Sequence, residues 1–343
     1  MRRVRFVALG DSLTEGVGDP VGQGWRGWAA LLADGLTRDD AEIVEAREAH
    51  GTAEAHEARE AHGAYEAPPA RGTPAVSGLP GMPGDGRVAV AAGTGSAVTG
   101  VEFTNLAVSG AQTRDVLERQ LPAGLALRPD IVSVVVGVND TLRCTFDIHA
   151  VAARLDTVYG AFAGQGAVLL TACLPDPGAT LGLPGALARP LARRQRAVNA
   201  VVHALSERYG AVHLHAAEGA WTTDRSMWSA DRLHPGERGH RQLALRFHAL
   251  LAEAGLAHGP APSPDPQRPA PTTSASLWWL ATAGTGWVAR RCTDLLPQLL
   301  TLAADELRHR ARGTSARLDL RTSAAVSAAL AALSTPEPRP DAA

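Results

Sequence analysis

Lysine is absent from the 343-residue sequence, so all 33 of its basic residues are arginine. This absence excludes any chemistry that needs a lysine amine, such as a Schiff base or the phosphate-binding lysine of a P-loop. Acidic residues number 35, which leaves a formal net charge of -2. A chain so close to neutrality is not expected to be a dedicated nucleic-acid-binding protein.

Cysteines and long apolar runs are also scarce. Cys144, Cys173 and Cys292 include no close pair, so the sequence predicts neither a disulfide framework nor a zinc site of recognisable spacing. Free cysteines favour a reducing compartment. The apolar run at residues 6–9 is too short for a secretory signal peptide, and no run of about 18 apolar residues occurs. We therefore expect a cytoplasmic protein without a transmembrane segment.

Two segments are not expected to form packed structure. Residues 39–99 contain a duplicated EAREAHG sequence followed by Pro- and Gly-rich sequence, which predicts a disordered, low-complexity insertion. Residues 259–276 hold six prolines, which predicts a stiff linker. The predicted organisation is a main domain at 1–258 with this insertion, the linker, a helical Trp/Leu-rich extension at 277–333, and a disordered tail at 334–343.

Short apolar runs alternate with amphipathic segments in the rest of the chain. Strands are predicted at residues 4–9, 101–108, 131–136, 167–173 and 212–214. Helices are predicted at residues 25–36, 113–121, 151–162, 191–209 and 237–254. Strands that alternate with helices indicate an α/β protein, a three-layer α/β/α sandwich around a five-stranded parallel sheet. Functional residues are expected at the carboxyl ends of its strands.

Four short motifs stand at or just after the ends of predicted strands. In chain order they are Gly10-Asp11-Ser12-Leu13, Gly110 within NLAVSGAQT, Gly137-Val138-Asn139-Asp140, and Asp231-Arg232-Leu233-His234-Pro235. Together these motifs resemble the SGNH/GDSL hydrolase family of esterases and lipases. The resemblance covers residues 3–36 and 101–254, and it implies the flavodoxin-like SGNH hydrolase fold for the domain at 1–258.

The resemblance also implies a serine hydrolase that cleaves carboxylic esters through an acyl-enzyme. Ser12 matches the nucleophile of the family, His234 the base that accepts its proton, and Asp231 the acid that orients the base. A serine hydroxyl needs such a base because it is a weak nucleophile on its own. The oxyanion hole of the family corresponds to the backbone N–H groups of Ser12 and Gly110 and to the side-chain amide of Asn139, which stabilise a developing negative oxygen.

Supporting roles are expected for two further carboxylates. Asp11 is predicted to tie the Ser12 loop by accepting backbone hydrogen bonds, and Asp140 to shape the Asn139 turn. Trp228 either walls the substrate pocket or packs in the core, and both interpretations stay open. Nothing in the sequence calls for a metal or an organic cofactor.

Alternative functions share the same residues. An acyltransferase or a thioesterase would use the same chemistry, whereas a non-catalytic ligand-binding or membrane-surface module would be expected to lack a site residue, and none is missing. The expected substrate is a small-molecule, lipid or carbohydrate ester. For the Trp- and Leu-rich residues 277–302, three alternatives stay open, namely docking onto the main domain, peripheral contact with a membrane, and a lid over the acyl pocket.

Overall fold

The computed structural model describes residues 2–36, 98–257, 259–269 and 296–334, together with the single residues 272, 274 and 278. The predicted insertion at 39–99 lies outside these residues apart from its last two positions, as does the predicted tail apart from Ser334. The domain boundaries at these segments therefore stay predictions.

A five-stranded parallel sheet forms the centre of the described structure, in the order β4-β1-β5-β6-β7. The strands are β1 (Arg2–Gly10), β4 (Val98–Asn105), β5 (Ile131–Val135), β6 (Val168–Cys173) and β7 (Val212–His215). This arrangement confirms the predicted α/β class and sheet. Every residue of β5 is buried, as its β-branched sequence without alternation predicts for a strand that is covered on both faces.

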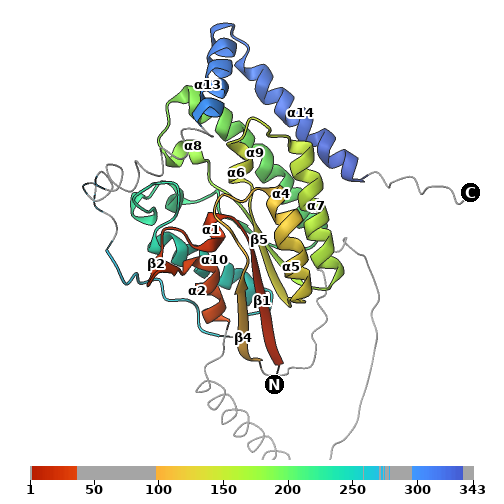
Figure 1. Ribbon diagram of the computed structural model, residues 1–343, viewed down its shortest axis with the longest axis vertical. Coiled ribbons are helices and arrows are strands. Elements are labelled where there is room, and N and C mark those ends of the chain that lie inside the picture. The colour runs from red at the N-terminus through yellow and green to blue at the C-terminus, as the bar shows by residue number, and fades with distance from the viewer. Residues whose placement is uncertain are drawn as a thin grey trace, which may run out of the picture.

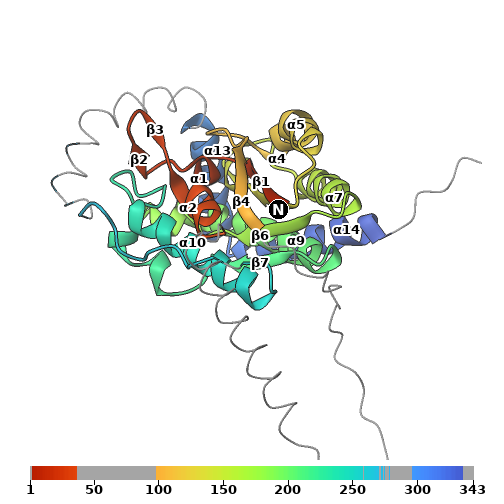
Figure 2. The same ribbon diagram turned by 90° about the horizontal axis from the view of Figure 1, so that it is seen from below.

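Helices cover the two faces of the sheet and give the three layers seen in Figures 1 and 2. One face packs on α2 (Gly27–Gly35) and α10 (Glu237–Glu253), and the other on α5 (Leu121–Ala126), α7 (Ile148–Gly164) and α9 (Gly185–Arg208). Successive residues of β1 pack against opposite helical layers, because side chains alternate along a strand. Phe6 and Ala8 belong to the core with α2 and α10, whereas Val7 and Leu9 belong to the other core.

Short elements follow the carboxyl ends of the strands and form the rim of the sheet. They are α1 (Ser12–Glu15), α4 (Thr113–Asp115), α6 (Val138–Thr141), α8 (Pro177–Thr180), and the 3-10 turns η2 (Ala220–Thr222) and η3 (Arg225–Met227). The segment predicted as one helix at 113–121 is in fact α4, a π-helical turn η1 (Val116–Gln120) and then α5.

The helix predicted from residue 25 begins later. Trp25 lies in β3 (Gly24–Trp25), which forms a small antiparallel hairpin with β2 (Pro20–Val21), and its side chain is 45% exposed. Gly27, with φ +69°, opens α2 at a point where it touches Gly16 so closely that a Cβ would lie 2.3 Å from the Gly16 Cα. The apolar spacing that includes Trp25 therefore misplaces the start of this helix.

Residues 259–269 differ from the prediction of an unpacked linker. They form neither helix nor strand, but they lie along α10 and bond to its side chains. The Glu237 carboxylate accepts a hydrogen bond from the Arg268 backbone N–H at 3.1 Å, and Arg241 donates to the Ser263 carbonyl oxygen at 2.8 Å. The prolines limit the hydrogen bonds that this segment can make internally, and α10 supplies partners instead.

The C-terminal residues 296–334 fold as a helical hairpin of α13 (Leu296–Ala311) and α14 (Ser315–Ser334), drawn in blue in Figure 1. The hairpin docks on α9 and α7. Ala329 is buried in the core that α7 and α9 share, and Arg193 of α9 forms ion pairs with Glu306 at 3.1 Å and Asp319 at 2.8 Å. Docking is therefore observed for this part of the extension, whereas residues 279–295 lie outside the described chain.

Among the helices that the structure describes, none combines the length and the apolar content that crossing a bilayer requires.

Removal of residues 271–343 is expected to lower the melting temperature by at least about 5 °C, since about 1 kcal/mol corresponds to 2–4 °C in a domain of this size. The truncation uncovers the apolar surface under Ala329 and leaves Arg193 without Glu306. It keeps residues 259–269 and their bonds to α10. Thermal unfolding and the hydrolysis of a short ester are the measurements, and hydrolysis should be retained. Identical melting of the two proteins would mean that the hairpin does not dock in solution.

Candidate active site

Ser12 lies two residues beyond the end of β1, the strand that stands between β4 and β5 in the sheet. The strand ends at Gly10, whose φ is +152° and where a Cβ would lie 2.2 Å from the Val135 carbonyl oxygen, so only glycine permits this approach. Asp11 caps the short helix α1, and Ser12 is the first residue of that helix. Its backbone N–H has no acceptor within the helix and is available to a ligand.

Gln120 fixes the strand end from the opposite side. Its Oε1 accepts a hydrogen bond from the Gly10 N–H at 2.8 Å, and its Nε2 donates to the Gly10 carbonyl oxygen at 2.9 Å. The side chain is buried and comes from the π-helical turn η1. Sequence reasoning missed Gln120, because its partner lies 110 residues away along the chain.

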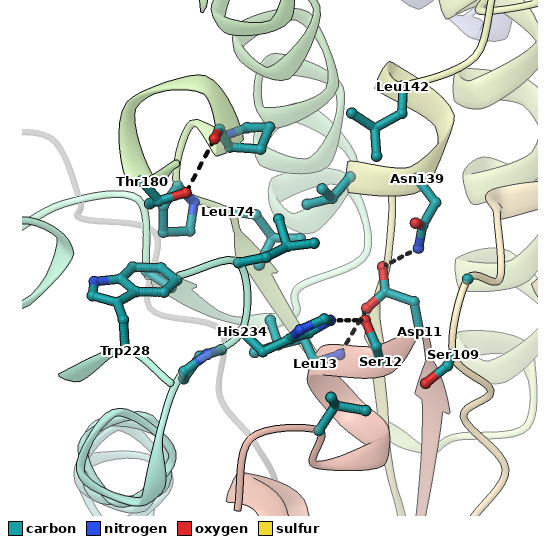
Figure 3. Close-up of a pocket in the computed structure, with 18 of the residues that line it drawn as sticks. Asp11, Ser12, Leu13, Ser109, Asn139, Leu142, Leu174, Thr180, Trp228 and His234 are labelled. Carbon is teal, nitrogen blue, oxygen red and sulfur yellow. Dashed lines mark hydrogen bonds between the residues drawn. The ribbon is translucent and has the colours of Figure 1, made fainter. Parts of the chain in front are cut away.

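His234 connects Ser12 to Asp231 through its two ring nitrogens. Its Nε2 lies 2.8 Å from Ser12 Oγ, a contact drawn in Figure 3, and its Nδ1 lies 2.7 Å from Asp231 Oδ2. Asp231 Oδ1 accepts three further hydrogen bonds, from Ser229 Oγ and from the N–H groups of Leu233 and His234. Burial alone would raise the pKa of Asp231, but the hydrogen bonds and charge of His234 outweigh it and lower the pKa to about 2.

A tight loop brings the acid and the histidine together. A bridge between Trp228 and Pro235 closes the loop, and the Ser229 N–H donates to the His234 carbonyl oxygen at 2.9 Å. Arg232 has φ +58°, a left-handed conformation that is uncommon for a residue with a side chain. This turn lets Asp231 fold back onto a histidine only three positions later.

Gly110 and Asn139 line the same pocket from the segments that follow β4 and β5. Asp140 of α6 joins these segments, because its buried carboxylate accepts hydrogen bonds from Thr113 Oγ1 at 2.6 Å and from the Thr113 N–H at 3.0 Å. Thr113 follows Gly110 by three residues, so Asp140 fixes the spacing between the two predicted oxyanion donors as well as the turn that carries Asn139.

The amide of Asn139 is engaged within the protein. Its Nδ2 donates to Asp11 Oδ2 at 3.2 Å and to the Ala111 carbonyl oxygen at 3.1 Å, and Figure 3 shows the bond to Asp11. Asp11 in turn accepts a hydrogen bond from the Leu13 N–H at 3.1 Å. An oxyanion bound beside Ser12 would therefore have to share the Asn139 amide with the Asp11 carboxylate.

The stability of the wild type relative to an Asp11→Asn variant is expected to depend on pH. Burial raises the pKa of Asp11 to about 6, in spite of the hydrogen bond from Leu13. The folded state therefore keeps this proton over a range in which the unfolded chain, with a pKa of about 4, has lost it. The stabilisation of the folded state by protonated Asp11 is complete below about pH 4 and is lost as the pH rises through 6.

The difference in unfolding free energy between wild type and Asp11→Asn should thus fall by about 3 kcal/mol between about pH 4 and pH 7, at 1.36 kcal/mol per pKa unit. Denaturant unfolding at a series of pH values measures it. Groups that both proteins share cancel in the difference, and any constant effect of the amide does not alter the slope. A flat difference would contradict the raised pKa.

A cavity of about 370 Å³ opens beside Ser12. Its lining is mainly apolar and includes Leu13, Leu142, Leu174, Trp221 and Trp228. Trp228 lines this cavity and is also largely buried, so it packs in the core, whereas its contact with a substrate stays a prediction. Its Nε1 donates to the Thr222 carbonyl oxygen at 3.1 Å, and its ring stacks on Trp221 with 5.4 Å between centroids. Sequence reasoning missed Trp221, since nothing in its neighbourhood indicates this stacking.

The chain is similar in sequence to a family of enzymes that hydrolyse esters. Residues 77–242 match the profile of the GDSL-like Lipase/Acylhydrolase family. This match agrees with the resemblance seen in the four motifs, three of which lie within the matched range. The matched range does not include Ser12, but the structure places this serine beside His234. A comparison with curated proteins finds no match.

Three solved structures illustrate the similarity. Axe2, an acetylxylan esterase from Geobacillus stearothermophilus, is 18% identical with a TM-score of 0.43, and the match covers 74% of this chain and 96% of that one. The psychrotrophic esterase EstA from Pseudoalteromonas sp. is 15% identical, with a TM-score of 0.44 and coverage of 73% and 97%. The lipase/acylhydrolase from Enterococcus faecalis is 16% identical, with a TM-score of 0.44 and coverage of 74% and 95%. Likeness at this level says nothing about the substrate of this chain.

Proposed function

We propose that the protein hydrolyses carboxylic esters through an acyl-enzyme on Ser12. The observation that carries the proposal is the continuous chain of contacts from Asp231 through His234 to Ser12, at 2.7 Å and 2.8 Å. With Nδ1–H donated to an ionised Asp231, the Nε2 lone pair of His234 faces the serine hydroxyl, which is the tautomer that a general base needs.

The reaction follows from these positions. Ser12 Oγ forms a bond to the ester carbonyl carbon while His234 Nε2 takes its proton, and the carbonyl π electrons move to the oxygen. The resulting oxyanion accepts hydrogen bonds from the N–H groups of Ser12 and Gly110 and from Asn139. Collapse expels the alcohol, which takes the proton from His234. Water then attacks the acyl-enzyme by the same steps and releases the acid and free Ser12.

The substrate that fits this site best is an ester with an apolar acyl group of short to medium length. The cavity beside Ser12 has room for such a chain, and leucine and tryptophan side chains line it. Acyl transfer to an alcohol and thioester hydrolysis remain alternatives, because both proceed through the same acyl-enzyme.

Labelling by a fluorophosphonate tests the proposal directly. The label should appear on the peptide that contains Ser12, and a p-nitrophenyl ester series should give the highest kcat/KM with short or medium chains. Added small alcohols distinguish a transferase, because they would be acylated in preference to water. A thioester series compared at equal chain length distinguishes a thioesterase. A protein that is not labelled at Ser12 and turns over no ester would be a binding module instead.

The Asn139→Ala variant is expected to lose about 10²- to 10³-fold in kcat, with a much smaller change in KM. The amide acts mainly on the negative charge that develops in the transition state, so substrate binding is little affected. Asn139→Asp is the matched variant, since it keeps the size of the side chain but replaces the amide donor by an acceptor, and it should be at least as slow. A change confined to KM in both variants would exclude Asn139 from the oxyanion hole.

A further inference from the structure

A second cluster of reactive side chains lies on the face of the sheet that α9 covers. It consists of Cys173, His203, His213 and His215, and one potential ligand atom from each lies within 4.8 Å of those of the other three. None of these residues takes part in the contacts from Asp231 to Ser12.

Strand register explains why residues so far apart in the sequence meet. Cys173 at the end of β6 pairs with His215 of β7, and Thr171 pairs with His213. Residues two apart in a strand face the same side of the sheet, and paired residues of neighbouring strands do so too. The side chains of these four strand residues therefore project from one face. His203 reaches the same place from α9, which packs on both strands.

A directed hydrogen-bond chain fixes the tautomer of His213. Ser206 Oγ donates to the Val202 carbonyl oxygen at 2.6 Å, which uses its only hydrogen. Thr171 Oγ1, at 2.7 Å from Ser206 Oγ, must therefore donate to it, and it accepts in turn from His213 Nδ1 at 2.9 Å. With the hydrogen on Nδ1, His213 Nε2 carries a bare lone pair.

Two of the imidazole nitrogens in this cluster lack partners. Within the described residues, Nε2 of His213 and Nε2 of His203 are buried and have no hydrogen-bond partner. The three imidazole rings pack edge to face, with centroids 4.7 to 5.1 Å apart. Buried polar atoms without partners are costly, and a cation bound by the lone pairs of these nitrogens would satisfy them.

We propose that Cys173, His203, His213 and His215 bind a Zn²⁺ ion that ties α9 to β6 and β7. One thiolate and three imidazoles form a ligand set that Zn²⁺ prefers. At bond lengths of about 2.0–2.3 Å, ligand atoms around tetrahedral zinc lie roughly 3.3–3.8 Å apart, so movements of at most about 1.5 Å close the site. The Nδ1–H bond of His213 to a hydroxyl is the outer support that a metal-ligating histidine normally has.

Four protein ligands leave no open position, so the ion would be structural. An ion at this place in the fold would also hold residues that line the cavity beside Ser12. Cys173 is followed directly by Leu174, and His215 by Ala216, and both of these next residues line the cavity. An ion held here would fix the ends of two strands beneath the candidate acyl pocket.

Titration of the chelator-treated full-length protein with Zn²⁺ and with Co²⁺ tests the site. One equivalent should bind, Co²⁺ should give a thiolate charge-transfer band, and the melting temperature should rise with the Zn²⁺ concentration. His215→Ala should weaken Zn²⁺ binding by more than about tenfold, and Cys173→Ser should abolish the cobalt band. The His215 side chain is 56% exposed, so its removal should leave the metal-free melting temperature unchanged.

Two matched control variants each remove a cysteine or histidine side chain that lies outside the cluster. Cys144→Ser removes an exposed thiol, and His149→Ala an exposed imidazole, and both should bind Zn²⁺ like the wild type. The proposal is overturned if the wild type binds no stoichiometric zinc, or if His215→Ala and Cys173→Ser bind it as tightly as the two controls do.

Discussion

Ester hydrolysis by a Ser12→Ala variant is expected to fall by roughly 10⁶ in kcat, the scale of loss when a serine nucleophile is removed. The hydroxyl lost is the one whose oxygen lies 2.8 Å from His234 Nε2. Because Ser12 begins a four-residue helix and its side chain packs little, the fold should be unaffected. The measurements are kcat/KM for p-nitrophenyl acetate and thermal unfolding.

Ser109→Ala is the matched control, because Ser109 lines the same cavity and its hydroxyl bonds to the Glu15 carboxylate instead of to a histidine. Its activity should stay within about tenfold of the wild type, as for a residue outside the reacting set. Near-normal hydrolysis by Ser12→Ala would show that another group attacks the ester.

The Asp231→Asn variant is expected to lose about 10⁴-fold in kcat while it keeps its fold. The asparagine carbonyl oxygen would take the position that faces three donors, on Ser229, Leu233 and the His234 backbone. Its NH₂ group would then face His234 Nδ1, which must become an acceptor. The ring proton moves to Nε2, and this nitrogen can no longer take the proton of Ser12.

Asp224→Asn provides the control on the same stretch of chain. Asp224 caps η3 by accepting a hydrogen bond from the Ser226 N–H and does not contact His234. Its kcat should therefore match the wild type. Equal activity of the Asp231→Asn variant and this control would exclude Asp231 from the reaction.

The sheet could be predicted from the sequence because its strands are short, apolar and separated by helical segments. The run at residues 131–136 has no alternation, and a strand covered on both faces is the simplest structure that it allows. Features that depend on distant partners were not predictable. Residues 259–269 form hydrogen bonds with Glu237 and Arg241 of α10, and nothing in the proline-rich sequence itself indicates either bond.

The residues proposed to carry the reaction could be selected from motifs at strand ends, and the structure brings Ser12, Asp231 and His234 into contact. The residues that hold them in place could not. In the sequence, Gln120 is an ordinary polar residue of a predicted amphipathic helix. In the structure, a π-helical turn directs its side chain at Gly10. The cluster of Cys173 with three histidines likewise depends on strand register, which residue spacing does not contain.

The separation of Ser12 from His234, 222 residues along the chain, has a consequence for biosynthesis. At about 5–20 residues per second, roughly 10–45 s of translation pass between these two positions. For about the first half of that interval β1 has no β5 to pair with, and throughout it the serine has no base beside it. Under the proposed mechanism a nascent chain cannot cleave esters until nearly the whole domain has left the ribosome, so fragments from interrupted translation carry the nucleophile in an inert form.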